Sequence, residues 1–96
     1  MKEKFYIVRC DKSGAFAGEI AERNGTEVTM KNARCIWYWN GAASLLQLAR
    51  EAVKNPDKCR YTAWVDELIL LDAIEIIPCT EEAEKSIKEV PEWRIK

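Results

Sequence analysis

The first thirty residues consist of short apolar stretches separated by turn residues. Residues 4–10 are rich in aromatic and β-branched side chains, and residues 26–30 alternate between apolar and polar positions, as a half-buried strand does. The segments Asp11–Gly14 and Asn24-Gly25 interrupt them, and Asn-Gly is typical of a type I′ hairpin turn. Residues 15–23 form the return strand. Gly18 in its middle indicates a bulge or a close approach by another backbone or a ligand.

Residues 35–39, Cys-Ile-Trp-Tyr-Trp, predict a fourth strand, which follows a short turn or bulge at Lys31-Asn32. Strand alternation puts Trp37 and Trp39 on one face and Arg34, Tyr38 and Asn40 on the other. If the tryptophans point into the core, the second face is an exposed strip that holds a cation, an aromatic ring and an amide. The alternative is that these aromatic residues serve only to pack the core and its rim.

The second half of the chain begins with a helix that Asn40 or Ser44 caps, since Ser44 and Gln47 have the capping-box spacing. Asn55-Pro56 ends this helix, and residues 59–65 form another strand. Residues 68–77 form one bent strand or two, with the break at residues 71–73. Thr80 caps a short second helix, and Trp93 in the extended tail folds back onto the sheet or onto a second subunit.

These elements predict one domain over residues 1–96 with an α+β fold. We expect a strongly bent antiparallel sheet of five to six strands, in the form of a small, partly open barrel that resembles SH3-like folds. One helix is inserted in the sheet and one lies near the C-terminus. Four tryptophans in 96 residues are many to bury, so we expect a homo-oligomer.

Composition narrows the range of functions. No apolar run reaches the roughly 18 residues that a membrane helix needs, and the first residues lack the apolar core of a signal peptide. We therefore expect a cytoplasmic protein without a membrane partner. The four cysteines form no Cys-x-x-Cys pair and the chain contains no histidine, so we expect neither a metal site nor disulfides.

Charge is unevenly distributed, although the net charge is only −1. Eleven basic and seven acidic residues precede or include Arg60, and four basic and nine acidic residues follow it. This balance argues against a protein that binds long nucleic acids. It allows a local basic pocket for a small anion near Arg9, Lys12, Lys31 and Arg34, or it simply keeps the surface soluble.

The sequence gives little indication of catalysis. Histidine is the commonest general base, and the chain has neither a phosphate-binding glycine loop nor a nucleophile elbow. We expect no cofactor and no catalytic residue. The less favoured alternative is a small nucleotide-cleaving enzyme in which Glu19 or Asp66 acts as acid or base.

Three stretches, residues 32–45, 74–81 and 90–93, carry a resemblance that spans most of the chain. With its Trp-x-Trp-Asn-Gly-Ala core, the chain resembles a family of small bacteriophage and prophage proteins to which no activity is attached. Small phage proteins often act against host defence, and some sequester cyclic nucleotide signals between the subunits of an oligomer. By analogy, the resemblance implies an anti-defence protein that works in the cytoplasm of the infected bacterium.

The favoured hypothesis is therefore a binding protein that sequesters a nucleotide-derived anion, such as a cyclic nucleotide or an ADP-ribose derivative. A phosphate would bind the basic groups and also the backbone amides of the Gly41-Ala42-Ala43 run at a helix entry. The favoured alternative for this run is an ordinary strand-to-helix turn that needs small residues for packing. The alternative is a protein–protein interaction module that uses the same aromatic strip. The candidate ligand-binding residues are Arg34, Lys31, Asn32, Trp37, Tyr38, Trp39, Asn40, Gly41 and Arg9.

Overall fold

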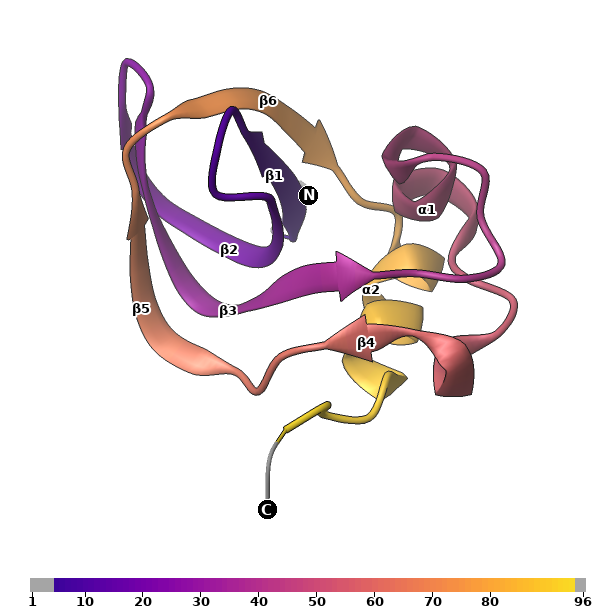
Figure 1. Ribbon diagram of the computed structural model, residues 1–96. Coiled ribbons are helices and arrows are strands. Elements are labelled where there is room, and N and C mark those ends of the chain that lie inside the picture. The colour runs from indigo at the N-terminus through magenta and orange to yellow at the C-terminus, as the bar shows by residue number, and fades with distance from the viewer. Residues whose placement is uncertain (1–4, 95–96) are drawn as a thin grey trace.

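The computed structural model describes residues 5–94 and confirms an α+β fold (Figure 1). Within these residues, six antiparallel strands form the sheet, and two helices pack against it. The strand order is β4-β3-β2-β1-β6, and β5 pairs with β3. The elements are β1 (Tyr6–Cys10), β2 (Ala15–Asn24), β3 (Glu27–Tyr38), α1 (Leu45–Glu51), a 3-10 turn (Pro56–Lys58), β4 (Arg60–Tyr61), β5 (Val65–Leu70), β6 (Ala73–Pro78) and α2 (Glu81–Glu89).

The long strand β3 organises the sheet. One of its edges pairs with β2. Its other edge pairs with β5 near its start and with β4 near its end. After a break at Leu71-Asp72, the chain continues from β5 into β6, which pairs with β1. The strands therefore curl into a partly open barrel, as the ring of β1, β2, β3, β5 and β6 in Figure 1 shows.

The expectation of two separate strands at residues 26–30 and 35–39 is wrong, because β3 runs without a break from Glu27 to Tyr38. Lys31-Asn32 is a bulge and not a turn. The pairing of β2 with β3 shifts register between Ala17 and Glu19, and Asn32 has a positive φ of 49°. A Cβ on Gly18 would lie 2.8 Å from the Cα of Ala33. The expected close approach of another backbone at Gly18 is thereby confirmed.

The hairpin at Asn24-Gly25 forms where the sequence predicts it, but the turn type differs. Asn24 pairs with Glu27, so Gly25 and Thr26 are the two loop residues. Gly25 has a φ of 65°, whereas neither Asn24 nor Thr26 is among the residues with positive φ. A type I′ turn needs positive φ at both central residues; glycine at the first central position alone is typical of type II′.

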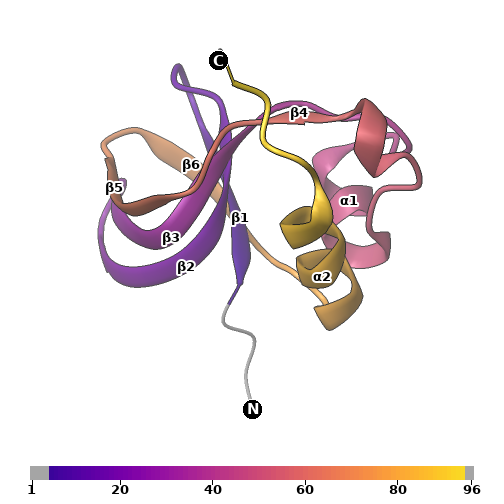
Figure 2. The same ribbon diagram turned by 90° about the horizontal axis from the view of Figure 1, so that it is seen from below.

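Both helices begin at the residues that the capping patterns indicate. Ser44, and not Asn40, caps α1, and its hydroxyl accepts a hydrogen bond from the amide of Gln47. The Thr80 hydroxyl caps α2 in the same way. α1 ends at Glu51, before the predicted stop at Asn55-Pro56. Figure 2 shows the two helices side by side against one side of the sheet.

Two apolar clusters hold the fold together. One lies between the helices and the sheet and includes Phe5, Ile7, Leu48, Tyr61 and Ile87, each at most 3% exposed. The second lies among the curled strands and includes Val8, Val28, Met30 and Leu70. Each helix therefore buries one apolar face against the sheet, as expected for amphipathic helices.

The strand at residues 59–65 is shorter than expected, because β4 consists only of Arg60–Tyr61. The cysteines are free, as expected, and three of the four are buried. Within residues 5–94, no helix is long and apolar enough to cross a membrane.

Candidate functional site

The aromatic stretch of β3 exposes Trp37 and buries Arg34, which is the reverse of the orientation that a basic strip requires. Arg34 is only 1% exposed and Ile36 is buried, whereas Trp37 is 57% exposed. The expected exposed strip of Arg34, Tyr38 and Asn40 is therefore wrong at its cation, Arg34, although Tyr38 is exposed as expected. Alternation along a strand defines two faces, but α2, which follows about fifty residues later, packs over the Arg34 face and buries it.

Arg34 connects β3 to the end of α2. Its Nη1 donates to the carbonyls of Ile87 and Val90, both at 2.9 Å, and its Nε donates to the carbonyl of Thr62 at 2.9 Å. The guanidinium also lies 4.8 Å from the ring centre of Trp64. Since carbonyls at a helix C-terminus carry partial negative charge, they stabilise this cation. Burial lowers the pKa of Arg34, and the residue cannot be an exposed phosphate ligand.

The other predicted basic residues do not come together in a pocket. Arg9 donates to Glu75 on β6 at 2.8 Å, and Lys31 donates to Glu67 on β5 at 3.0 Å. Each cation is thus engaged by a carboxylate on a different strand. The structure offers no support for a shared basic pocket that includes Arg34.

Trp39, Asn40 and Gly41 belong to a packed loop. The Nε1 of Trp39 donates to the carbonyl of Ala42 at 3.1 Å, and the Oδ1 of Asn40 accepts from Asn55 at 2.7 Å. Gly41 has a φ of 96°, and a Cβ there would lie 2.6 Å from the backbone nitrogen of Lys54. Glycine is therefore required by the backbone at this position.

The expected phosphate site at the helix entry also finds no support. Regular helix begins at Leu45 and not at Gly41. The amide of Ala43 already donates to the side chain of Gln47, and the amide of Gln47 donates to Ser44. Two amides at this helix entry are therefore already bonded to side chains of the chain itself.

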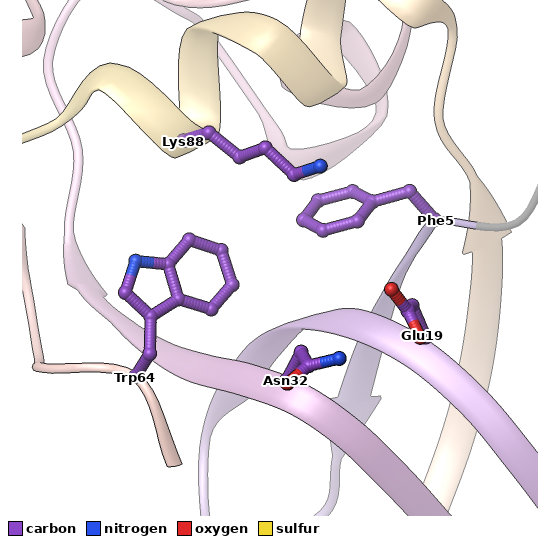
Figure 3. Close-up of a pocket in the computed structure, with 5 residues that line it drawn as sticks. All are labelled: Phe5, Glu19, Asn32, Trp64 and Lys88. Carbon is purple, nitrogen blue, oxygen red and sulfur yellow. The ribbon is translucent and has the colours of Figure 1, made fainter. Parts of the chain in front are cut away.

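A pocket of about 400 Å³ lies elsewhere, between α2 and the bulge at Gly18 in the pairing of β2 with β3 (Figure 3). Lys88 comes from α2, and Trp64 precedes β5. Glu19 and Asn32 flank the Gly18 bulge on the opposite wall. We call this set the α2 pocket; its lining residues are Phe5, Glu19, Asn32, Trp64 and Lys88.

The α2 pocket combines aromatic walls with groups of both charges. The rings of Phe5 and Trp64 lie 6.3 Å apart at an angle of 58°, and the Nζ of Lys88 lies 5.5 Å from the centre of the Phe5 ring. The same Nζ donates to Glu84 at 2.7 Å. Figure 3 shows Lys88 on one side of the hollow and Glu19 and Asn32 on the other. Pockets of this size, with aromatic walls and a few polar groups, are suited to small molecules.

Of the ligand-binding candidates predicted from the sequence, Asn32 is the one that lines this pocket, and Glu19, one of the two residues named in the enzymatic alternative, lines it too. Gly18 gave an indirect signal, because a strand glycine can indicate a ligand nearby, and the pocket lies beside this bulge. No local sequence pattern singled out Lys88 as a ligand-binding residue. Its spacing from Glu84 predicts an ordinary i,i+4 ion pair on the helix surface. Phe5 and Trp64 read as ordinary apolar residues.

A second feature is an exposed aromatic surface on the outer face of β3 and β4. The rings of Trp37 and Trp93 stack with centres 4.9 Å apart at 7°. The guanidinium of Arg60 lies 5.9 Å from the first ring and 5.2 Å from the second. Trp93 is 51% and the neighbouring Tyr38 is 47% exposed. The expectation that Trp93 folds back onto the sheet is confirmed, and we call these four residues the tryptophan cluster.

The family described as "Domain of unknown function (DUF6948)" matches residues 3–87. No curated protein and no solved structure matches the chain. The tail that carries Trp93 lies beyond the matched residues.

Proposed function

The chain belongs to the family described as "Domain of unknown function (DUF6948)", and since that description assigns no activity, we propose a function from the α2 pocket. The pocket binds a small planar anion of the nucleotide type and holds it without chemical change. The observation that carries this proposal is the placement of Lys88 across from Glu19 and Asn32, between the rings of Phe5 and Trp64.

Positive charge favours an anionic ligand. Lys88 lies along one side of the hollow with its ammonium group beside the Phe5 ring (Figure 3), and the buried Arg34 guanidinium lies 4.8 Å from the centre of the Trp64 ring. A buried cation acts at longer range than an exposed one because water screens it less. Lysine can exchange its surface contact with Glu84, which is worth only about 0.3–0.5 kcal/mol, for a phosphate oxygen.

The remaining lining residues suit a heterocyclic base. Trp64, which is partly exposed, offers aromatic surface beside the buried ring of Phe5, and stacking of a base on such a ring contributes about 1–3 kcal/mol. The Glu19 carboxylate accepts hydrogen bonds from a ring N–H or amino group, and the Asn32 amide can both donate and accept. A ligand with an amino-bearing ring and a phosphate satisfies all of these groups.

We place sequestration ahead of catalysis because binding needs only these contacts. The phage-encoded anti-defence role that the sequence resemblance implies remains a prediction of the same proposal, and cyclic nucleotides and ADP-ribose derivatives are the first ligands to test. The nucleotide-cleaving alternative would use Glu19, the carboxylate among the residues that line the α2 pocket.

The test is a thermal-shift screen against cyclic dinucleotides, cyclic trinucleotides and ADP-ribose derivatives, with mass spectrometry of the recovered ligand. A ligand present at about 100 times its dissociation constant adds about 2.7 kcal/mol to the free energy of unfolding. Recovery of an intact ligand supports sequestration. Recovery of a cleaved ligand replaces it with the enzymatic alternative.

Two lysines on the same helix provide a matched pair of variants. Lys88→Ala removes the proposed phosphate contact and should weaken binding about 10- to 100-fold, since a hydrogen bond to a charged group contributes about 1.5–3 kcal/mol. Lys85→Ala removes the same charge from an exposed position of α2 that does not line the pocket, and should change binding by less than about twofold. Equal effects of the two variants would mean that the pocket is not the site.

A further inference from the structure

Residues 91–94 lie along the outer edge of β4 and are joined to it by one isolated bridge at Glu92. The amide of Trp93 donates to the carbonyl of Tyr61 at 2.9 Å, and Glu92 forms a parallel bridge with Tyr61. In Figures 1 and 2 this segment runs past β4 toward the C-terminus. Within residues 5–94, no further strand pairs with its outer side.

The direction of the Trp93 amide fixes which backbone groups face outward. Successive residues of a strand point their amide and carbonyl groups to opposite edges. Since the Trp93 amide faces β4, the backbone groups of Glu92 and Arg94 face away from the sheet. These groups form an open edge of the kind that pairs with another strand.

We propose that this edge is a homodimer interface, in which residues 92–94 of two copies pair antiparallel about a two-fold axis through Trp93. Glu92 then lies opposite the partner's Arg94, and Arg94 lies opposite the partner's Glu92. Both are hydrogen-bonded pairs, since the outward groups belong to these two residues, so the interface contains four backbone hydrogen bonds. This dimer goes beyond the ligand-binding function and does not depend on it.

The side chains are complementary in the same register. Glu92 and Arg94 share one face of the strand, where the Arg94 Nη1 already donates to Glu92 at 2.8 Å. Antiparallel pairing centred on Trp93 puts each carboxylate opposite a guanidinium, and opposite charges across a strand pair are stabilising. The segment Glu-Trp-Arg is therefore self-complementary under two-fold symmetry. This property favours a second copy of the chain over an unrelated protein as the partner.

The other face of the strand brings the tryptophan clusters together. Trp93 meets the partner's Trp93 as a non-hydrogen-bonded pair, the position where facing side chains lie closest. Each Trp93 already stacks on Trp37 beside Arg60, so the dimer covers aromatic surface that is about half exposed in one copy. Trp, Tyr and Arg are the residue types that dominate binding energy at interfaces.

Charge reversal tests the proposed register by sedimentation equilibrium. Glu92→Arg puts two basic side chains opposite each other, and Arg94→Glu does the same with two acidic ones. Each single variant should raise the dimer dissociation constant at least about tenfold. The double variant Glu92→Arg/Arg94→Glu restores opposite charges, and it should dimerise about as well as the original chain.

An equimolar mixture of the two single variants adds an independent outcome, because each variant supplies the charge that the other needs. The mixture should form a heterodimer although each variant alone is mainly monomeric. Glu89→Arg makes the same charge change at an exposed residue of α2 and should leave dimerisation unchanged. A monomeric original chain at all concentrations overturns the proposal, and so does a dimer that the single variants leave intact.

Discussion

The guanidinium of Arg34 in the middle of β3 donates a 2.9 Å hydrogen bond to the carbonyl of Val90, just beyond the end of α2. This contact, with the equal one to Ile87, fixes the C-terminal end of α2 over the sheet. The position of α2 in turn places Lys88 at the α2 pocket, and residues 91–94 follow directly along β4. A residue expected to bind a ligand therefore fixes the helix that carries Lys88 of the proposed ligand site.

Arg34→Met should lower the free energy of unfolding by about 3–5 kcal/mol, because it leaves the carbonyls of Ile87 and Val90 buried without their donor. Urea denaturation measures the loss. Arg60→Met removes an exposed arginine whose guanidinium lies over the rings of Trp37 and Trp93, and should cost no more than about 1 kcal/mol. Similar losses for the two variants would contradict the structural role of Arg34.

Gly18→Ala should lower the free energy of unfolding by about 1–3 kcal/mol, since the new methyl group would overlap the backbone of Ala33 and force the bulge to shift. The clash is with main-chain atoms at 2.8–2.9 Å, which cannot rotate away. Glu22→Ala, at an exposed position on the same strand, should change stability by less than about 0.5 kcal/mol. Unaltered urea midpoints in both variants would show that the bulge tolerates a side chain.

Asp72→Asn should make stability less dependent on pH in the acid range. The amide of Lys12 donates to the Asp72 carboxylate at 2.8 Å and the Ser13 hydroxyl donates at 3.1 Å, and these bonds hold the pKa of Asp72 below its ordinary value of 3.8. A lowered pKa in the folded state contributes stability above the ordinary pKa. That contribution is lost as the pH falls through the lower, folded value.

Urea midpoints measured between about pH 7 and about pH 2 should therefore show the original chain as more stable near neutrality, with the difference shrinking below about pH 4. Asp66→Asn, at an exposed position on β5, should follow the original chain throughout this range. A difference between the Asp72 variant and the original chain that stays constant with pH would point to a cause other than ionisation.

Tyr61→Phe should leave the free energy of unfolding unchanged or raise it by up to about 1 kcal/mol, because it removes a buried hydroxyl without leaving a nitrogen or oxygen atom unpaired. The hydroxyl has no nitrogen or oxygen partner within the described residues, and burial raises the pKa of Tyr61. Tyr61→Ala removes the whole ring from the core and should cost about 3–5 kcal/mol. Thermal denaturation of both variants distinguishes the hydroxyl from the ring, and a large loss in Tyr61→Phe would reveal a hydrogen bond there.

Local signals in the sequence were sufficient for much of the fold. Ser44 and Thr80 begin the helices as expected, the chain turns after Asn24, and the strand breaks at Leu71-Asp72. Each of these features depends on a few neighbouring residues whose side chains bond to the nearby backbone or allow an unusual φ. The interactions that stabilise a helix cap or a tight turn therefore lie within a few residues of sequence, where they can be recognised without the rest of the fold.

The buried face of residues 34–40 could not be read from the sequence. Alternation defines two faces, each of which carries aromatic and polar residues, so composition gives no reason to choose between them. The choice is made by the end of α2, whose carbonyls need a donor and find it in Arg34. The continuity of β3 through Lys31-Asn32 is likewise decided by Gly18 on the facing strand.

The sequence by itself determined the α+β class, the antiparallel strands, the helix starts and the presence of an unusually aromatic segment, since these follow from periodicity and short-range bonding. Only the tertiary structure decided that Arg34 is internal, that Lys88, Glu19 and Trp64 meet in one pocket, and that Trp93 stacks on Trp37. The physical reason is that a side chain's burial and neighbours depend on segments that pack against it from far along the chain. No local pattern encodes which segments those are.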